Sequence, residues 1–230
     1  MSEPGEIILI NSTTCAGKTT LTREVQKLSQ KPYLATDYDT FIGMMASKYV
    51  MLHESILQPQ HHPYATTSNE WTREGFEVQL KVANPKTYRL MMGKAAWNII
   101  RGMTHSYAAL AKTGNNLVLG DIITEQLLPE YCVAFQGLKV YFVGVDCSLQ
   151  ELERREDVMP NRTVGCARGQ IEQVHVPGEY DMWVNTEKNN PTVCAQQILD
   201  FVAKNPPKVF ATLVDRYKDK IATTYPVPWW

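Results

Sequence analysis

The sequence predicts an α/β protein with three layers, in which helices cover both faces of a mostly parallel β-sheet. Two observations lead to this prediction. Short apolar runs alternate with helical patterns along most of the chain, and the first run leads into a small polar loop followed by an amphipathic helix. Strands that alternate with helices are joined by right-handed crossovers, which makes neighbouring strands parallel. A chain of 230 residues suffices for one such unit with an insertion, so we expect a single domain over residues 1–230.

Four apolar runs have the length and composition of interior strands. The first is rich in isoleucine and lies between Gly5 and Asn11. Their near-continuous apolar character indicates strands in a sheet that is covered on both faces. In chain order the predicted strands are Glu6–Ile10, Tyr33–Thr36, Leu117–Leu119 and Lys139–Val145.

Apolar residues at helical spacing predict the helices of the outer layers. A stripe at positions 21, 25 and 28 predicts a helix over residues 18–30, which Pro32 ends. Asn190 and Pro191 have the residue types of an N-cap and a first-turn proline. Gly114 stands where a C-cap glycine belongs. The predicted helices cover residues 18–30, 87–113, 149–158 and 191–203.

Two segments interrupt the alternation. Residues 46–86 contain several prolines and show no clear period, so we expect an irregular insertion that shapes the substrate site. Residues 205–230 contain a Pro-Pro pair, then apolar residues at helical spacing, and end in Tyr-Pro-Val-Pro-Trp-Trp. We expect a C-terminal helix there and an aromatic tail. The tail either packs against the domain or binds a partner, because exposed paired tryptophans are costly.

The composition excludes several classes of protein. The 23 Lys and Arg residues balance 24 Asp and Glu residues, for a net charge of −1, so we expect no nucleic-acid partner and no membrane partner. The five cysteines form no CxxC pair, which argues against a disulfide framework and a zinc knuckle. The N-terminal apolar run is too short for a signal-peptide core or a membrane-spanning helix. We therefore expect a cytoplasmic protein.

The loop after the first predicted strand carries the strongest functional signal. It has the strand–loop–helix setting of a phosphate-binding loop, with Gly17, Lys18 and Thr19 in the essential positions. In such loops backbone N–H groups surround a phosphate, the lysine reaches the β- and γ-phosphates, and the Thr hydroxyl ligates Mg²⁺. One departure is Ser12, which stands where the GxxxxGK[ST] pattern begins with glycine. We expect the nucleotide to contact Ser12, Thr13, Thr14, Cys15, Ala16, Gly17, Lys18, Thr19 and Thr20.

Three aspartates lie where predicted strands end. Asp37 and Asp39 follow the second strand, and on an extended backbone their side chains would project to the same side. One carboxylate would then contact the magnesium shell and the other accept a proton from a substrate hydroxyl. The alternative interpretation is an aspartate that opens the next helix as its N-cap. Asp121 ends the third strand, a position from which a carboxylate holds Mg²⁺ through water.

Several arginines follow the fourth predicted strand, in a region from residue 150 to 175 that we interpret as a lid. Arginines on a segment that closes over a triphosphate neutralise the charge that develops on the transferred group. The alternative is a solvated helix face with ion pairs between residues four apart. The arginines concerned are Arg154, Arg155, Arg162 and Arg168.

These motifs resemble those of the chloramphenicol phosphotransferase-like kinases. The resemblance runs from about Ile7 to Val202 and is densest near the phosphate loop and across residues 141–187. There the family elements VGV-x-C, R-E, D-R, V-H and E-Y-D correspond to Val143–Cys147, Arg155-Glu156, Asn161-Arg162, Val174-His175 and Glu179–Asp181.

The resemblance implies a P-loop kinase fold with a parallel sheet of about five strands and an arginine-bearing lid. It places Asp39 on the position of the catalytic base. Asp37 stands where the antibiotic kinase has glycine, so its metal role follows instead from the DxD pattern of shikimate-kinase-like enzymes. By this resemblance the residues of catalysis and of phosphate and metal binding are Lys18, Thr19, Asp39, Arg155 and Arg162.

These motifs together predict an ATP- and Mg²⁺-dependent kinase that phosphorylates a hydroxyl group of a small molecule. Residues 46–86 and the tail after Ala203 do not follow the antibiotic kinase, so the acceptor is expected to differ from chloramphenicol. Two alternatives stay open: a kinase that acts on a macromolecular hydroxyl, and a nucleotide-binding regulatory protein with little catalysis, which Ser12 favours. No NKxD base-recognition motif is present, which disfavours a GTPase. A homodimer is compatible with the sequence.

Overall fold

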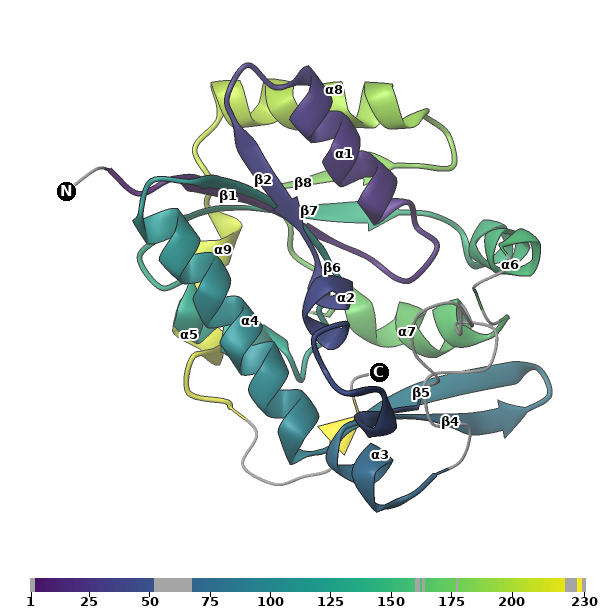
Figure 1. The fold of residues 1–230 in the computed structure, drawn as a ribbon. Coiled ribbons are helices and arrows are strands. Elements are labelled where there is room, and N and C mark those ends of the chain that lie inside the picture. Colours follow the sequence, from purple (N-terminus) through teal and green to yellow (C-terminus); the bar gives the residue numbers. More distant parts are fainter. Residues whose placement is uncertain are drawn as a thin grey trace.

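The computed structural model describes residues 3–51, 68–159, 162, 164–176, 178–221 and 227–228. Its centre is a five-stranded sheet with the strand order β2–β6–β1–β7–β8 (Figure 1). Every neighbouring pair in this sheet is parallel, which confirms the predicted α/β fold class. The strands are β1 (Glu6–Asn11), β2 (Tyr33–Thr36), β6 (Asn116–Asp121), β7 (Lys139–Asp146) and β8 (Met182–Asn185).

The helices form the outer layers and the connections at the carboxyl edge of the sheet. The helix predicted over residues 149–158 is present with those bounds, and a further helix follows Pro207 as expected. The helices are α1 (Lys18–Leu28), α2 (Tyr38–Ile42), α3 (Glu70–Glu74), α4 (Lys94–Lys112), α5 (Leu128–Ala134), α6 (Leu149–Val158), α7 (Cys166–Val174), α8 (Pro191–Lys204) and α9 (Val209–Tyr217).

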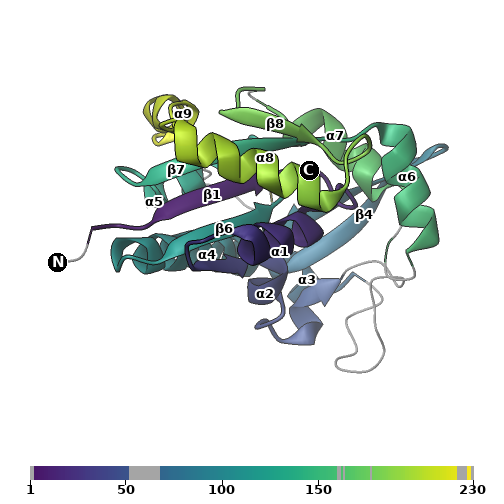
Figure 2. The same cartoon turned by 90° about the horizontal axis from the view of Figure 1, so that it is seen from above.

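Alternate residues of the central strand β1 face the two helical layers. Ile7 and Leu9 belong to an apolar core that includes residues of α4, α5 and α9. Ile8 and Ile10 belong to a second core with residues of α1 and α8, and these two helices lie side by side on one face of the sheet (Figures 1 and 2). All four side chains are fully buried, because a central strand of a three-layer sandwich has helices on both faces.

The carboxyl edge of the sheet gathers the predicted functional segments. The phosphate loop leaves β1 there, and α2 begins directly after β2. Asn11, the last residue of β1, is paired in register with Asp121, the last residue of β6. The parallel register therefore brings together residues that are far apart in the sequence.

A second sheet has four strands in the order β3–β4–β5–β9, and α2 and α7 lie between it and the central sheet (Figure 1). A short 3₁₀ helix, η1 (Ser47–Tyr49), and α3 accompany it. The prediction of irregular structure over residues 46–86 is therefore wrong for residues 46–51 and 68–86, and residues 52–67 lie outside the described part. The strands are β3 (Val50–Met51), β4 (Phe76–Ala83), β5 (Lys86–Met92) and β9 (Val227–Pro228).

The helix predicted over residues 87–113 begins only at Lys94. The preceding residues form β5, in which Tyr88, Leu90 and Met92 are buried and alternate with less buried residues. That period of two is the pattern of a strand with one covered face. The C-terminal prediction is confirmed for α9, while the final Trp229-Trp230 pair lies outside the described residues. None of the helices in the described part is both long enough and apolar enough to span a bilayer.

Candidate active site

The phosphate loop connects β1 to α1 at the centre of the carboxyl edge. Gly17 is the N-cap of α1 and has a left-handed backbone with φ of 87°, which glycine adopts without steric cost. Cys15 has φ of 57° and is the single non-glycine residue with positive φ among the described residues. These conformations turn the chain sharply into α1. The loop therefore lies at the positive end of a helix, where backbone N–H groups bind anions.

Ser12 fits the loop although the usual pattern begins with glycine. Its backbone is not among the positive-φ positions of the described residues. The side chain is buried, and its hydroxyl donates a hydrogen bond to the carbonyl oxygen of Val145 at 2.8 Å. Ser12 therefore ties the start of the loop to β7, and its presence gives no physical reason for impaired phosphate binding.

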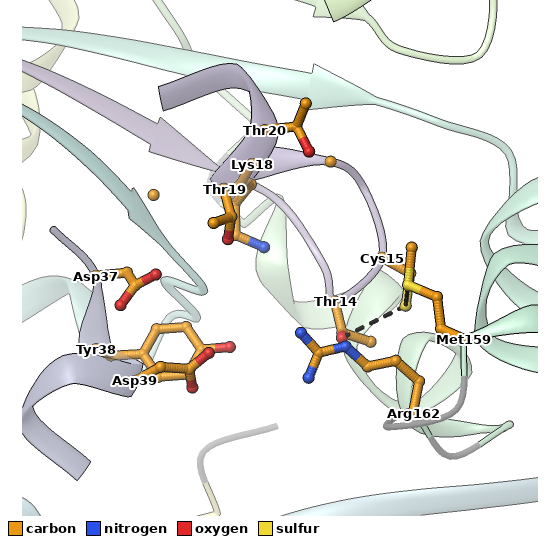
Figure 3. Close-up of a pocket in the computed structure, with 12 residues that line it drawn as sticks. Thr14, Cys15, Lys18, Thr19, Thr20, Asp37, Tyr38, Asp39, Met159 and Arg162 are labelled. Atoms are coloured by element: carbon orange, nitrogen blue, oxygen red, sulfur yellow. Dashed lines mark hydrogen bonds between the residues drawn. The ribbon is translucent and has the colours of Figure 1, made fainter. Parts of the chain in front are cut away.

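A cleft opens beside the loop and is lined by residues from four parts of the chain. Figure 3 shows Lys18, Asp39 and Arg162 pointing toward one another across it. The loop and α1 form one wall, the start of α2 forms another, and the segment after α6 supplies the third. The lining residues are Thr14, Cys15, Gly17, Lys18, Thr19, Thr20, Asp37, Tyr38, Asp39, Gly120, Met159 and Arg162.

Lys18 is the cation at the centre of the cleft. Its side chain is 7% exposed, and Nζ donates a hydrogen bond to the carbonyl oxygen of Thr13 at 2.5 Å. Burial lowers the pKa of Lys18 to about 8, and the nearby carboxylates of Asp39 and Asp121 act in the opposite direction. The ammonium is thus held at the mouth of the loop, where a bound phosphate would meet it.

Asp37 and Asp39 both line the cleft, but not by the predicted geometry. The backbone is extended only at Asp37, and α2 begins at Tyr38, so the prediction of an extended pair is wrong. Asp37 is the N-cap of α2: its Oδ1 accepts hydrogen bonds from the backbone N–H and the hydroxyl of Thr40, both at 3.2 Å. Asp39 lies in the first turn of the helix. The alternative interpretation of a helix-opening aspartate therefore holds for Asp37.

Asp39 has the environment of a proton acceptor. Burial raises the pKa of its carboxyl, and the charge of Asp37 raises it further, while Arg162 and Lys18 oppose the shift. A carboxylate with a raised pKa binds a proton more readily than one with an ordinary pKa. Asp39 also lines the cleft, so its carboxylate is accessible to a bound substrate.

Asp121 is fully buried and does not line the cleft. Its Oδ1 accepts a hydrogen bond from the backbone N–H of Tyr38 at 2.9 Å, and Oδ2 accepts one from the hydroxyl of Tyr131 at 2.8 Å. Burial raises its pKa to about 7. The contact with Tyr38 fixes the start of α2, and hence the neighbouring acidic pair, against the sheet. A role of Asp121 in holding Mg²⁺ stays a prediction.

The two arginines that the sequence places on a predicted lid differ in their surroundings. Arg162 lines the cleft, and its Nε is buried without a hydrogen-bond partner in the described part of the chain. Arg155 is absent from the cleft lining; its guanidinium donates hydrogen bonds to Glu151, to the carbonyl of Cys15 and to Thr186. In this structure Arg155 therefore braces the back of the phosphate loop, and Arg162 is the arginine that reaches the cleft.

Two supporting residues were not predicted from the sequence. Thr186, after β8, donates its hydroxyl hydrogen bond to the carbonyl of Ala16 at 2.9 Å. Gln170, on α7, accepts a hydrogen bond from the backbone N–H of Thr14. These contacts join residues 156 or more positions apart, so no local motif or period indicates them.

The cleft offers oxygen ligands that suit Mg²⁺. Thr19 and Asp37 both line it, and the second oxygen of Asp37 accepts no hydrogen bond within the described part of the chain. Among the described residues no group of three His, Cys, Asp or Glu side chains forms a complete metal cage. Mg²⁺ in nucleotide sites is usually held by one or two protein oxygens plus phosphates and water, so this sparse donor set fits.

Comparison with known proteins places the chain in a family. A family model described as chloramphenicol phosphotransferase-like protein matches residues 5–203. The chain belongs to this family. Two relatives from strains of Mycobacterium tuberculosis, whose names propose an O-phosphotransferase activity for them, are each 26% identical over 187 residues. The match covers 79% of this chain and 75% of each relative.

Solved structures show that this family member has the fold of P-loop kinases. The APS kinase of Mycobacterium tuberculosis, in complex with AMPPNP and APS, superposes with a TM-score of 0.55 at 13% identity, covering 88% of this chain and 100% of that one. A sugar kinase from Janibacter sp. gives a TM-score of 0.54 at 12% identity, covering 88% and 96%. The predicted resemblance and the P-loop kinase class are thus confirmed at the level of family and fold.

Proposed function

We propose that this protein is an ATP- and Mg²⁺-dependent kinase that transfers the γ-phosphate of ATP to a hydroxyl group of a small molecule. The observation that carries the proposal is the convergence of Lys18, Arg162 and Asp39 on one cleft beside the phosphate loop. Two cations suit a triphosphate, and one carboxylate beside them suits the hydroxyl that attacks it.

Each residue of the cleft has a separate role in the proposed phosphate transfer. The loop amides and Lys18 bind the β- and γ-phosphates, and Arg162 neutralises charge on the transferred group. The acceptor oxygen forms a bond to the γ-phosphorus while the bond to the β–γ bridging oxygen breaks, so that ADP leaves. The hydroxyl proton passes to a carboxylate oxygen of Asp39. Thr19 and Asp37 would hold Mg²⁺, which supplies further neutralisation of the phosphate charge.

The alternative of a binding protein with little catalysis loses its main support, because Ser12 is accommodated by its hydrogen bond to Val145. We favour a small-molecule acceptor. Nucleic acid in particular is disfavoured, because a net charge of −1 gives the protein no overall attraction to a polyanion. A cytoplasmic location and the absence of a membrane partner stay predictions from the sequence, as does the compatibility with a homodimer.

The test is a screen with γ-labelled ATP against metabolite mixtures, followed by identification of the labelled product. We expect the wild type to label an alcohol. Lys18→Ala should lose ATP binding and transfer together. Asp39→Asn should keep nucleotide affinity within about threefold and lose transfer by about 10²-fold to 10⁴-fold, the usual contribution of a general base.

The matched control is Asp215→Asn, the same substitution at an exposed position of α9. It should transfer phosphate at the rate of the wild type. Full transfer by Asp39→Asn would exclude Asp39 as the base, and failure of the wild type to bind ATP would exclude the kinase itself.

A further inference from the structure

Helix α7 has a buried side chain that hydrogen-bonds to the phosphate loop. Gln170 is 1% exposed, and its Oε1 accepts a hydrogen bond from the backbone N–H of Thr14 at 2.6 Å. Thr14 lines the cleft but Gln170 does not. The carboxamide therefore lies behind the loop, and it supports the loop without occupying the space of a phosphate.

The same peptide unit is held at its other end by the lysine of the loop. The N–H of Thr14 and the carbonyl of Thr13 belong to one peptide bond, and that carbonyl accepts the hydrogen bond from Nζ of Lys18 at 2.5 Å. In a planar trans peptide the N–H and the C=O point in opposite directions. Fixing the N–H on Gln170 therefore fixes the direction in which the carbonyl meets the ammonium.

The position of Gln170 is set by elements outside the loop. Glu156 of α6 accepts hydrogen bonds from the backbone N–H groups of Gly165 and Ala167, at 2.9 and 2.7 Å, where α7 begins. The carbonyl of Gly165 accepts one from the backbone N–H of Tyr88 in β5 at 3.2 Å. Helix α7 is thus anchored to α6 and to the second sheet, and it presents Gln170 to the loop from a fixed base.

We propose that Gln170 is a positioning residue for the phosphate loop: it orients the Thr13–Thr14 peptide so that the carbonyl holds the Lys18 ammonium at the cleft. This inference rests on the proposed function, because the position of the ammonium matters only if phosphate binds there. Without the carboxamide, the peptide gains freedom to rotate and the Thr14 N–H loses its partner. The ammonium then has a less defined position when the nucleotide arrives.

The test compares Gln170→Leu and Gln170→Asn with a matched control, Gln173→Leu. Leucine removes the acceptor, and asparagine keeps an amide but is one methylene shorter and does not reach Thr14. Gln173 lies on the same helix, and its Oε1 has no hydrogen-bond partner in the described part of the chain. Calorimetry would measure the affinities for ATP and AMP, and amide hydrogen exchange would follow Thr14.

We expect both Gln170 variants to bind ATP roughly threefold to tenfold more weakly, the range of one net hydrogen bond, with little change for AMP, which lacks the β- and γ-phosphates. Exchange of the Thr14 amide should accelerate in these variants and not in Gln173→Leu. An unchanged ATP affinity in the folded Asn variant would overturn the inference, as would equal losses for ATP and AMP, which indicate general damage. If the wild type binds no ATP, the proposed function on which the inference rests is refuted instead.

Discussion

The substitution Asp121→Asn should stabilise the fold at alkaline pH. The carboxyl of Asp121 is fully buried, and burial raises its pKa from 3.8 to about 7. Between these two pH values the folded state keeps a proton that the unfolded state releases. The contribution of Asp121 to the free energy of unfolding therefore falls as pH rises from about 4 to about 7, and it stays low above that range.

The size of the effect follows from the shift in pKa. A shift of about three units, at about 1.4 kcal/mol for each, bounds the cost of the buried charge at about 4 kcal/mol. Asparagine has no such charge, and its Oδ1 still accepts the hydrogen bond from the Tyr38 N–H. In the variant the Lys18 ammonium lacks the stabilising negative charge of Asp121, which reduces the gain in the free energy of unfolding. We expect a net stabilisation of about 2 kcal/mol at pH 8.

Urea unfolding at pH 5 and pH 8 measures this difference, with the exposed Asp215→Asn as the control. Wild type and control should lose stability together between the two pH values, and Asp121→Asn should lose about 3 kcal/mol less than they do. If Asp121→Asn is destabilised by the same amount at both pH values, the carboxylate does not cost the fold free energy when it is charged. The account of its burial would then be wrong.

Three further predictions concern the cleft, the base of α7 and helix α4. Because the pKa of Lys18 is lowered to about 8, ATP affinity should be steady below pH 7 and fall above pH 8, by up to about tenfold per pH unit; calorimetry from pH 6.5 to 9.5 checks this, and a flat profile contradicts it. Gly165→Ala should destabilise the fold by at least about 2 kcal/mol in urea unfolding, because φ is 107° and the new Cβ would lie 2.3 Å from the carbonyl oxygen of Lys86. Gly102→Ala in α4, where a Cβ meets open space, should instead be neutral or stabilising by up to about 1 kcal/mol.

The central sheet and the phosphate loop could be predicted because their signals are local. Every residue of β1 is buried, and Ile7, Ile8, Leu9 and Ile10 form a continuous apolar run, which is typical of an interior strand covered on both faces. The loop follows directly, and its Gly-Lys-Thr sequence depends on a few adjacent positions. The same holds for α6, whose bounds match the prediction and whose N-cap Ser148 accepts a hydrogen bond from the backbone of Glu151.

The parts that could not be predicted depend on contacts that are distant in the sequence. In the edge strand β8 only Val184 is buried, so it lacks an interior apolar run. In β5 buried and less buried residues alternate with a period of two, and the strand directly precedes α4. The apolar residues at helical spacing in α4 conceal where the period of two ends. The bond between Gln170 and Thr14 spans 156 residues, so only the fold brings these two groups together.

The charges at the carboxyl edge of the sheet explain why stability and function are coupled there. Burial lowers the pKa of Lys18 and raises those of Asp39 and Asp121, so each charge is disfavoured by its surroundings and favoured by its opposite neighbours. Removing the charge of Asp121 relieves one desolvation cost but leaves the Lys18 ammonium with less support. The pKa of Lys18 should therefore fall further in Asp121→Asn, and the alkaline loss of ATP affinity should begin at a lower pH than in the wild type. A variant that gains stability while it loses part of its pH range for binding is the expected result when a site retains costly buried charges for its function.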